Sequence, residues 1–290
     1  MVTLAIACES GTYKGVFVHG VLSAFEKYKL YANAYGAASS STLPTPCAVI
    51  GKAREIGVDY WCEAIDAQKL NKSNMSHVVI RSIKKYSPLL RKNLFLLSNP
   101  RLIIAASAVI IDSAAQTTQS KDARRLGRKL LISSQRGDLS WVRENLETHY
   151  FDTHDAEGKY KLNSDNLEEV AYASTRMLHA WDIPAWIDKK PYIDASYTCS
   201  CPTLKLADLG FSHIITVATE PGDTYTNIFQ NQKIPNHWRD SKISFIKPSL
   251  NLKNIGVDYT SATVEGMKKA YEMGFEEGRK FVESHAIPSA

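Results

Sequence analysis

The chain has 290 residues, of which 44% are hydrophobic and 22% charged, the proportions of an ordinary soluble globular protein. Its longest apolar run, 102–111, is about half the ~20 residues that a bilayer requires, which argues against a membrane-spanning protein. The start lacks a basic signal-peptide region, so we expect a cytoplasmic protein. Five cysteines without a CxxC spacing and histidines without a ligand spacing predict no metal site, and we expect no cofactor.

The net charge of +5 is concentrated in one segment. Between Ser76 and Arg136 twelve basic residues face only Asp112 and Asp122, so this segment carries +10 and the rest of the chain −5. Such asymmetry indicates either an anionic partner or a solvated helical face. We expect peripheral contact with a membrane or with an acyl carrier. We expect no nucleic-acid binding, because no motif or aromatic stacking platform accompanies the charge.

Strands alternate with helices along most of the chain. The patterns predict strands at 2–8, 31–36, 149–154, 191–193, 213–217 and 244–246, and helices at 16–29, within 51–70 and at 166–178, 204–209 and 263–284. This alternation is typical of an α/β fold, and we expect three α/β/α layers around a largely parallel central sheet. Without a repeat or a linker, the chain is expected to form one domain over 1–290.

The basic segment at about 76–136 interrupts this alternation. We expect it to be an amphipathic cap inserted into the domain. Its apolar run 102–111 favours a buried helix slightly over the wall of an acyl channel or a segment that dips into a lipid interface.

Three distant segments carry residues typical of a serine hydrolase. The first is a loop at 9–15 (Glu-Ser-Gly-Thr-Tyr-Lys-Gly), between a predicted strand and a predicted helix. The second is the Ser-rich turn at 35–41, placed as a nucleophile elbow would be. The third is the acid Asp194, about 155 residues further on. A Ser-rich turn alone is more often a cap, so the interpretation depends on the order of the three.

In this order, with His19-Gly20-Val21-Leu22 and the helix 173–178, the segments resemble the patatin-like acyl hydrolases. That family has an Asp/Glu-Gly-Gly-Gly-x-Arg/Lys-Gly loop, a Gly-x-Ser-x-Gly elbow and an Asp-Gly-Gly/Ala motif. The resemblance implies a patatin-like fold and covers most of the chain outside the basic segment.

The resemblance also implies a Ser–Asp dyad. Ser39 would attack an ester carbonyl and form an acyl-enzyme, and Asp194 would accept its proton and later activate water. Backbone N–H groups around Gly11 and Thr12 would form the oxyanion hole, and Lys14 would stand where the family has a basic residue.

Two departures from the family pattern leave alternatives open. Of the loop's three consecutive glycines only Gly11 remains, and the elbow has Ala37 and Ser41 where glycines are usual. If Gly36 is instead the first elbow glycine, the nucleophile position falls on Ala38. An ungapped count from His19 favours Ser39.

The predicted function is therefore hydrolysis of a lipid or another acyl ester. The same chemistry permits an acyltransferase that passes the acyl group to an alcohol or a carrier. An alanine at the nucleophile position would instead make the chain a silent acyl- or lipid-binding pseudoenzyme.

Overall fold

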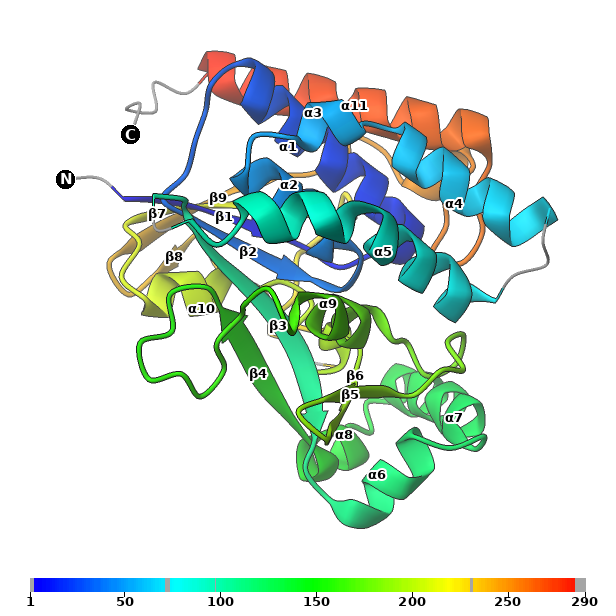
Figure 1. Cartoon of the computed structure of the whole chain (residues 1–290). Helices are drawn as coiled ribbons and strands as arrows, with labels where there is room; N and C mark the ends of the chain where they lie inside the picture. Colours follow the sequence, from blue (N-terminus) through cyan, green and yellow to red (C-terminus); the bar gives the residue numbers. More distant parts are fainter. Residues whose placement is uncertain (1–2, 71–73, 97, 230–231, 285–290) are drawn as a thin grey trace.

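A central sheet organises the chain (Figure 1). The structure, a computed structural model, describes residues 3–70, 74–96, 98–229 and 232–284, so Val2 of the first predicted strand lies outside the described residues. Within them the sheet has nine strands in the order β5-β6-β3-β2-β1-β7-β9-β8, with β4 also paired to β3. The strands are β1 Leu4–Cys8, β2 Ala34–Ala38, β3 Arg101–Val109, β4 Leu146–Asp152, β5 Ala185–Ile187, β6 Lys190–Ile193, β7 His213–Val217, β8 His237–Trp238 and β9 Ser241–Ile246.

The middle of this sheet is parallel. Strand β1 pairs in parallel with β2 on one side and with β7 on the other. On the outer sides, β2 pairs in parallel with β3, and β7 with β9. All five side chains of β1 are buried. Ile6 and Cys8 belong to the core on one face, whereas Ala5 and Ala7 belong to the core on the other. Because both faces are buried, the sequences of the central strands β1 and β2 are continuous runs of apolar or small residues.

The two faces of the sheet are covered unequally (Figure 1). One carries most of the helices, and the other carries α10. The longer helices of the first face are α1 Gly15–Lys27, α4 Asp59–Leu70, α5 Met75–Asn93, α9 Leu167–Thr175 and α11 Val264–Ser284, joined by the short α2 Pro44–Val49 and α3 Ala53–Ile56; α10 spans Thr203–Asp208. The architecture is thus α/β with a largely parallel sheet, as the sequence predicts.

Three further helices gather beyond the end of β3: α6 Asp112–Thr118, α7 Ala123–Gln135 and α8 Ser140–Asn145. Single 3-10 turns complete the chain: η1 Thr12–Lys14, η2 Ser39–Thr42, η3 Ala195–Tyr197 and η4 Leu252–Ile255. None of the helices in the described residues combines the length and the apolar character that crossing a bilayer requires.

The basic segment 76–136 does not form one inserted cap. It divides among α5, β3, α6 and α7, and β3 pairs with β2 inside the central sheet. The prediction that 102–111 is a buried helix is therefore wrong, as is its alternative, the wall of an acyl channel. Leu102–Val109 is a strand whose apolar side chains fill both faces of the sheet.

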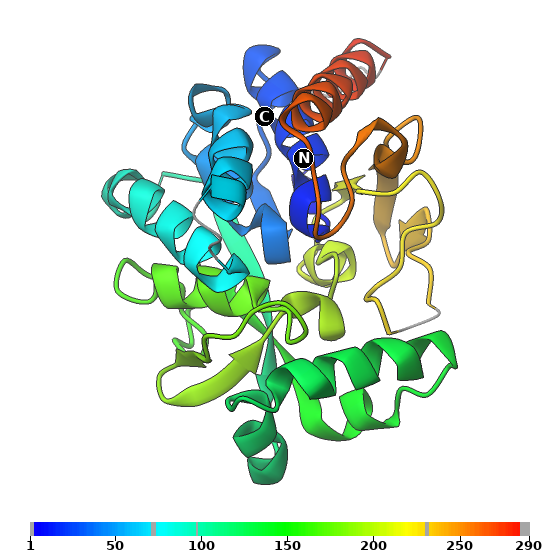
Figure 2. The ribbon, with the colours of Figure 1, turned by 90° about the vertical axis from the view of Figure 1, so that its right-hand side faces the viewer.

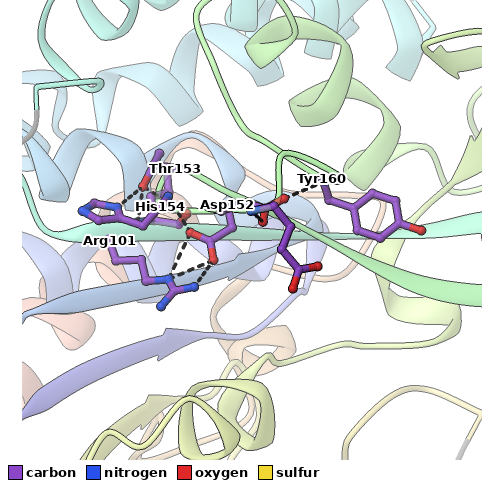
Figure 3. A network of polar contacts seen from close by, with 8 residues as sticks. Arg101, Asp152, Thr153, His154 and Tyr160 are labelled. Carbon is purple, nitrogen blue, oxygen red and sulfur yellow. Dashed lines mark hydrogen bonds and ion pairs between the residues drawn. The ribbon is translucent and has the colours of Figure 1, made fainter.

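A polar network holds the start of β3 against the end of β4 (Figure 3). The guanidinium of Arg101 donates from Nε to Oδ2 of Asp152 over 2.8 Å. The backbone N–H of His154 donates to Asp152 Oδ1, and that of Leu102 donates to Thr153 Oγ1. The network turns the chain after β4, and it neutralises one cation of the basic segment.

Candidate active site

Ser39 directly follows β2 as the first residue of η2, and its backbone has a φ of 52°. A non-glycine residue with positive φ is strained, and such strain is typical of a nucleophile elbow. The backbone N–H of Ser39 donates to Ser174 Oγ on α9 over 2.9 Å. Its hydroxyl donates to Asp194 Oδ2 over 2.7 Å. The structure thus brings together two predicted residues that are far apart in the chain.

Asp194 lies between β6 and η3 and is 1% exposed. Its Oδ1 accepts hydrogen bonds from the backbone N–H and the hydroxyl of Ser196. Its own backbone is fixed on both sides, because its N–H donates to Arg176 O and its carbonyl accepts from Ser107 Oγ on β3. Burial raises the pKa of Asp194 to about 6, and the bonds from Ser196 and Ser39 oppose that rise.

Ala38, the alternative nucleophile position, has a different environment. It is the last residue of β2, with an extended backbone and no exposed surface. Its methyl group packs in a small apolar cluster with Ala105, Ala195 and Cys199. Between the two registers, only Ser39 stands next to a carboxylate and lines a hollow in the protein.

The loop expected to hold the oxyanion precedes η1, next to the turn. A Cβ atom added to Gly11 would lie 2.9 Å from the Thr219 side chain, so this position has room only for glycine. Thr12 has a φ of 50° and takes the strained conformation that glycine usually adopts. Within the described residues no acceptor bonds the backbone N–H of Gly11 or Thr12. Both residues line a hollow together with Ser39.

The ammonium group of Lys14 contacts Glu220 and Tyr259, which lie far from it in the sequence. The residue is 2% exposed, and its ammonium group forms an ion pair with Glu220 and lies 4.2 Å from the centroid of the Tyr259 ring. The Tyr259 hydroxyl also donates to Glu220. Lys14 lines neither of the hollows that contain Ser39. Its contacts connect η1 to the segment around Tyr259, and its predicted oxyanion role stays a prediction.

Glu9, the first residue of the loop, is a half-buried carboxylate. It accepts hydrogen bonds from the backbone N–H and the hydroxyl of Thr219, over 2.6 and 3.0 Å. Burial raises the pKa of Glu9 to about 7, although these two bonds lower it. Since Thr219 also packs against Gly11, Glu9 holds the residue that confines the loop.

Two hollows meet at Ser39, and Thr12 and Trp181 line both of them. We call the larger one the mouth pocket; its volume is about 420 Å³. It is lined by Ser10, Gly11, Thr12, Ser39, Leu131, Ser134, Met177, His179, Trp181, Ser196, Ile228, Asp258, Tyr259 and Thr260.

We call the smaller hollow the channel. It runs between α4 and α5 and has a free volume of about 40 Å³, with a mostly apolar surface. Its lining comprises Thr12, Tyr13, Ser39, Ser40, Thr42, Leu43, Tyr60, Trp61, Ala64, Met75, Val78, Val79, Ser82, Ile83, Thr175 and Trp181. This arrangement offers two separate directions for the two halves of an ester.

Two buried histidines, His19 and His149, have structural partners. His19 Nε2 is bonded to Ala53 O, and its Nδ1 accepts from Trp61 Nε1. Burial lowers the pKa of His19 to about 4, which keeps it neutral. His149 is bonded to the hydroxyls of Tyr192 and Tyr160. No group of three metal-ligating side chains occurs in the ranges that the structure describes.

Sequence reasoning missed three serines that support the dyad. Ser196, two residues after Asp194, forms an Asx turn that an Asp-x-Ser spacing could have indicated. Ser174 and Ser107 come from α9 and β3, and no local pattern marks them. Their contacts depend on how the sheet and α9 pack, so only the fold reveals them.

Comparisons with known proteins yield a distant structural likeness. No protein-family model matches the chain, and no curated protein does. Among solved structures, the chain is similar to VipD from Legionella pneumophila, with a TM-score of 0.46 and 13% sequence identity, over 98% of this chain and 67% of that one.

Proposed function

We propose that the protein is a serine acyl hydrolase of the patatin-like type, which cleaves acyl esters with the dyad Ser39–Asp194. The hydrogen bond of 2.7 Å between the Ser39 hydroxyl and a buried carboxylate carries this proposal. A hydroxyl becomes nucleophilic when a base stands at hydrogen-bond distance. With a pKa near 6, Asp194 is mostly ionised at neutral pH and still basic enough to receive a proton.

The reaction has two steps. In the first, Ser39 Oγ attacks the ester carbonyl while its proton moves to Asp194. The tetrahedral intermediate collapses, the leaving alcohol takes the proton from Asp194, and the acyl group stays on Ser39. In the second, Asp194 takes a proton from water, the hydroxide attacks the acyl-enzyme, and Ser39 recovers its proton as the acid leaves.

The negative charge of both intermediates would fall on the carbonyl oxygen, for which the backbone N–H groups of Gly11 and Thr12 are available. Removing one such donor typically costs about 2.7–4 kcal/mol of transition-state stabilisation. The two hollows then divide the substrate. We assign the acyl chain to the apolar channel and the leaving group to the larger, more polar mouth pocket.

The proposal is tested with a fluorophosphonate probe and peptide mapping of the adduct. We expect the label on Ser39 and no label in Ser39→Ala. In Asp194→Asn we expect labelling, and turnover of a p-nitrophenyl ester, to fall on the order of 10³-fold or more, because the serine loses its base. Circular dichroism would confirm that both variants are folded.

Ser41→Ala serves as the matched control, because it removes a neighbouring buried hydroxyl that bonds backbone atoms of Ala38 and Cys8. It should keep the label. If wild-type protein took no label and hydrolysed no ester, but bound a fatty acid tightly, the hydrolase proposal would be wrong and the silent binding protein would replace it.

A further inference from the structure

Helix α7 and the residues beside it carry most of the unpaired positive charge of the basic segment. Six cations on and beside it are exposed, and no carboxylate of the described residues forms an ion pair with any of them. With Asp122 as the one acid in 121–136, this stretch has a net charge of +5, equal to that of the whole chain. The cations are Lys121, Arg124, Arg125, Arg128, Lys129 and Arg136.

Three of the six other cations in the basic segment are neutralised in ion pairs. Lys85 pairs with Glu63 over 2.6 Å, Arg91 pairs with Glu168 over 3.0 Å, and Arg101 pairs with Asp152. The other three, Arg81, Lys84 and Lys92 on α5, are exposed and form no ion pair with a described carboxylate. Because α7 and its flanks gather twice as many unpaired cations, we take α7 as the part of the segment that an anionic partner would contact.

The packing of α7 fixes which face is free. Ala123, Gly127 and Leu130 are buried. A Cβ atom added to Gly127 would lie 2.6 Å from His179 N, so α7 lies directly on the segment before β5. A second face supplies Leu131 and Ser134 to the mouth pocket. The cations therefore flank the opening that leads to Ser39.

The outward face combines charge with an aliphatic side chain. Arg125, Lys129, Ile132 and Arg136 are spaced by four, three and four residues, so they share one side of the helix. Ile132 is 52% exposed among these cations and lines a shallow groove with them. Figure 2 shows α7 in the lower part of the face at which β1 and β2 end, open to solvent.

We propose that this face of α7 docks on the surface of an anionic phospholipid bilayer. Cations near such a surface are attracted by about 1 kcal/mol each, and an aliphatic side chain among them can enter the headgroup region. A nucleic acid fits less well, because α7 carries no aromatic side chain on which a base could stack. Docking in this orientation would place the mouth pocket beside the bilayer.

Docking itself does not depend on the proposed hydrolase activity, so it is tested with the Ser39→Ala protein, which leaves vesicles intact. Co-sedimentation is measured with phosphatidylcholine vesicles with and without 30% phosphatidylserine. We expect binding only to the anionic vesicles, weakened by 0.5 M salt. Arg125→Gln/Lys129→Gln/Arg136→Gln should weaken it roughly a hundredfold, and Ile132→Ser severalfold.

The matched control removes the same charge from another face, with Lys268→Gln/Lys269→Gln/Lys280→Gln on α11, and should bind as the parent does. Equal weakening by both triple variants would show a general charge effect and overturn the proposal. So would unchanged binding by the α7 variant. Tighter α7-dependent binding to RNA or to an acidic carrier protein than to vesicles would assign the face to that partner instead.

Discussion

At the scale of single residues, the proposed dyad combines a strained serine with a carboxylate whose burial disfavours its ionised form. Three hydrogen bonds to Asp194 offset only part of this effect. A base of raised pKa is useful for catalysis because it accepts a proton more readily than an exposed carboxylate does. The same property makes activity depend on pH in a predictable direction.

We expect kcat/KM for a soluble ester to rise with pH and to level off above an apparent pKa of about 6. The base must be ionised to act, so the rate should fall about tenfold per pH unit below that value. A stopped assay from pH 4.5 to 8.5 measures this limb. A profile that is flat down to pH 4.5 would contradict the role of Asp194.

The pKa of Glu9 is raised to about 7, so the ionisation of Glu9 could also change kcat/KM over this pH range. The Glu9→Gln variant separates the two groups. Its amide can still accept from Thr219, so the loop is expected to keep its shape. If the limb near pH 6 remains in Glu9→Gln, it belongs to Asp194; if it disappears, Glu9 controls the rate.

The sequence predicted that Ser39 and Asp194 lie together, but not the residues that hold them. Ser39 and Asp194 could be found because the order of their segments matches a family pattern. Ala37 and Ser41 obscured the elbow, although the Ser41 hydroxyl bonds to backbone atoms of β1 and β2 and so suits this position. Ser174 could not be predicted, because its contact depends on the packing of α9 against the turn.

At the scale of elements, α4 and α5 define one side of the site. Their apolar side chains form the channel, whose free volume of about 40 Å³ has room for roughly three water molecules. A long acyl chain could enter it only as these side chains move apart. Substitutions on α5 should therefore change which acyl chains are accepted.

Val79 lines the channel and is half-buried, so a larger side chain there can be tolerated. We expect Val79→Trp to lower kcat/KM for decanoyl esters at least tenfold relative to acetyl esters, because the indole occupies the path of the chain. A series of p-nitrophenyl esters of increasing length measures the ratio.

The exposed Lys84 on the same helix gives the control, and Lys84→Trp should leave the ratio unchanged. Equal loss on all esters with Val79→Trp would indicate a disturbed dyad. No loss on any ester would move the acyl chain to the mouth pocket.

The wrong prediction of a buried helix over 102–111 is also explained by how elements pair. Ten consecutive apolar or small residues fit a buried helix and a buried strand equally well by periodicity. The chain forms a strand because β2 and β4 offer partners on both sides of it. Those partners come from distant parts of the sequence, and local pattern cannot supply them.

At the scale of the whole molecule, α1 and α11 join the two ends of the described chain. The helices pack so closely that a Cβ atom on Gly274 would lie 2.1 Å from Phe17 O, and one on Gly20 the same distance from Tyr271 O. Helix α1 begins directly after η1, next to the loop of Gly11 and Thr12. The contact between the two helices therefore helps to hold the loop of Gly11 and Thr12 in place.

We expect Gly274→Ala to destabilise the protein by about 3 kcal/mol, since the new methyl group would have to push two backbones apart. Urea unfolding followed by tryptophan fluorescence measures the change. Gly222→Ala is the control, because a Cβ atom there meets nothing within 4 Å, and it should change stability by less than about 0.5 kcal/mol. Similar costs for both would show that the two helices can separate easily.

The joining of α1 and α11 has a consequence for biosynthesis. About 240 residues separate the end of α1 from the start of α11. At 5–20 residues per second, a ribosome needs roughly 12 to 50 seconds to make them. During that interval α1 lacks the partner that covers its glycine face. The nascent chain thus carries Ser39 long before the loop of Gly11 and Thr12 gains its final support, which comes only when α11 has left the exit tunnel.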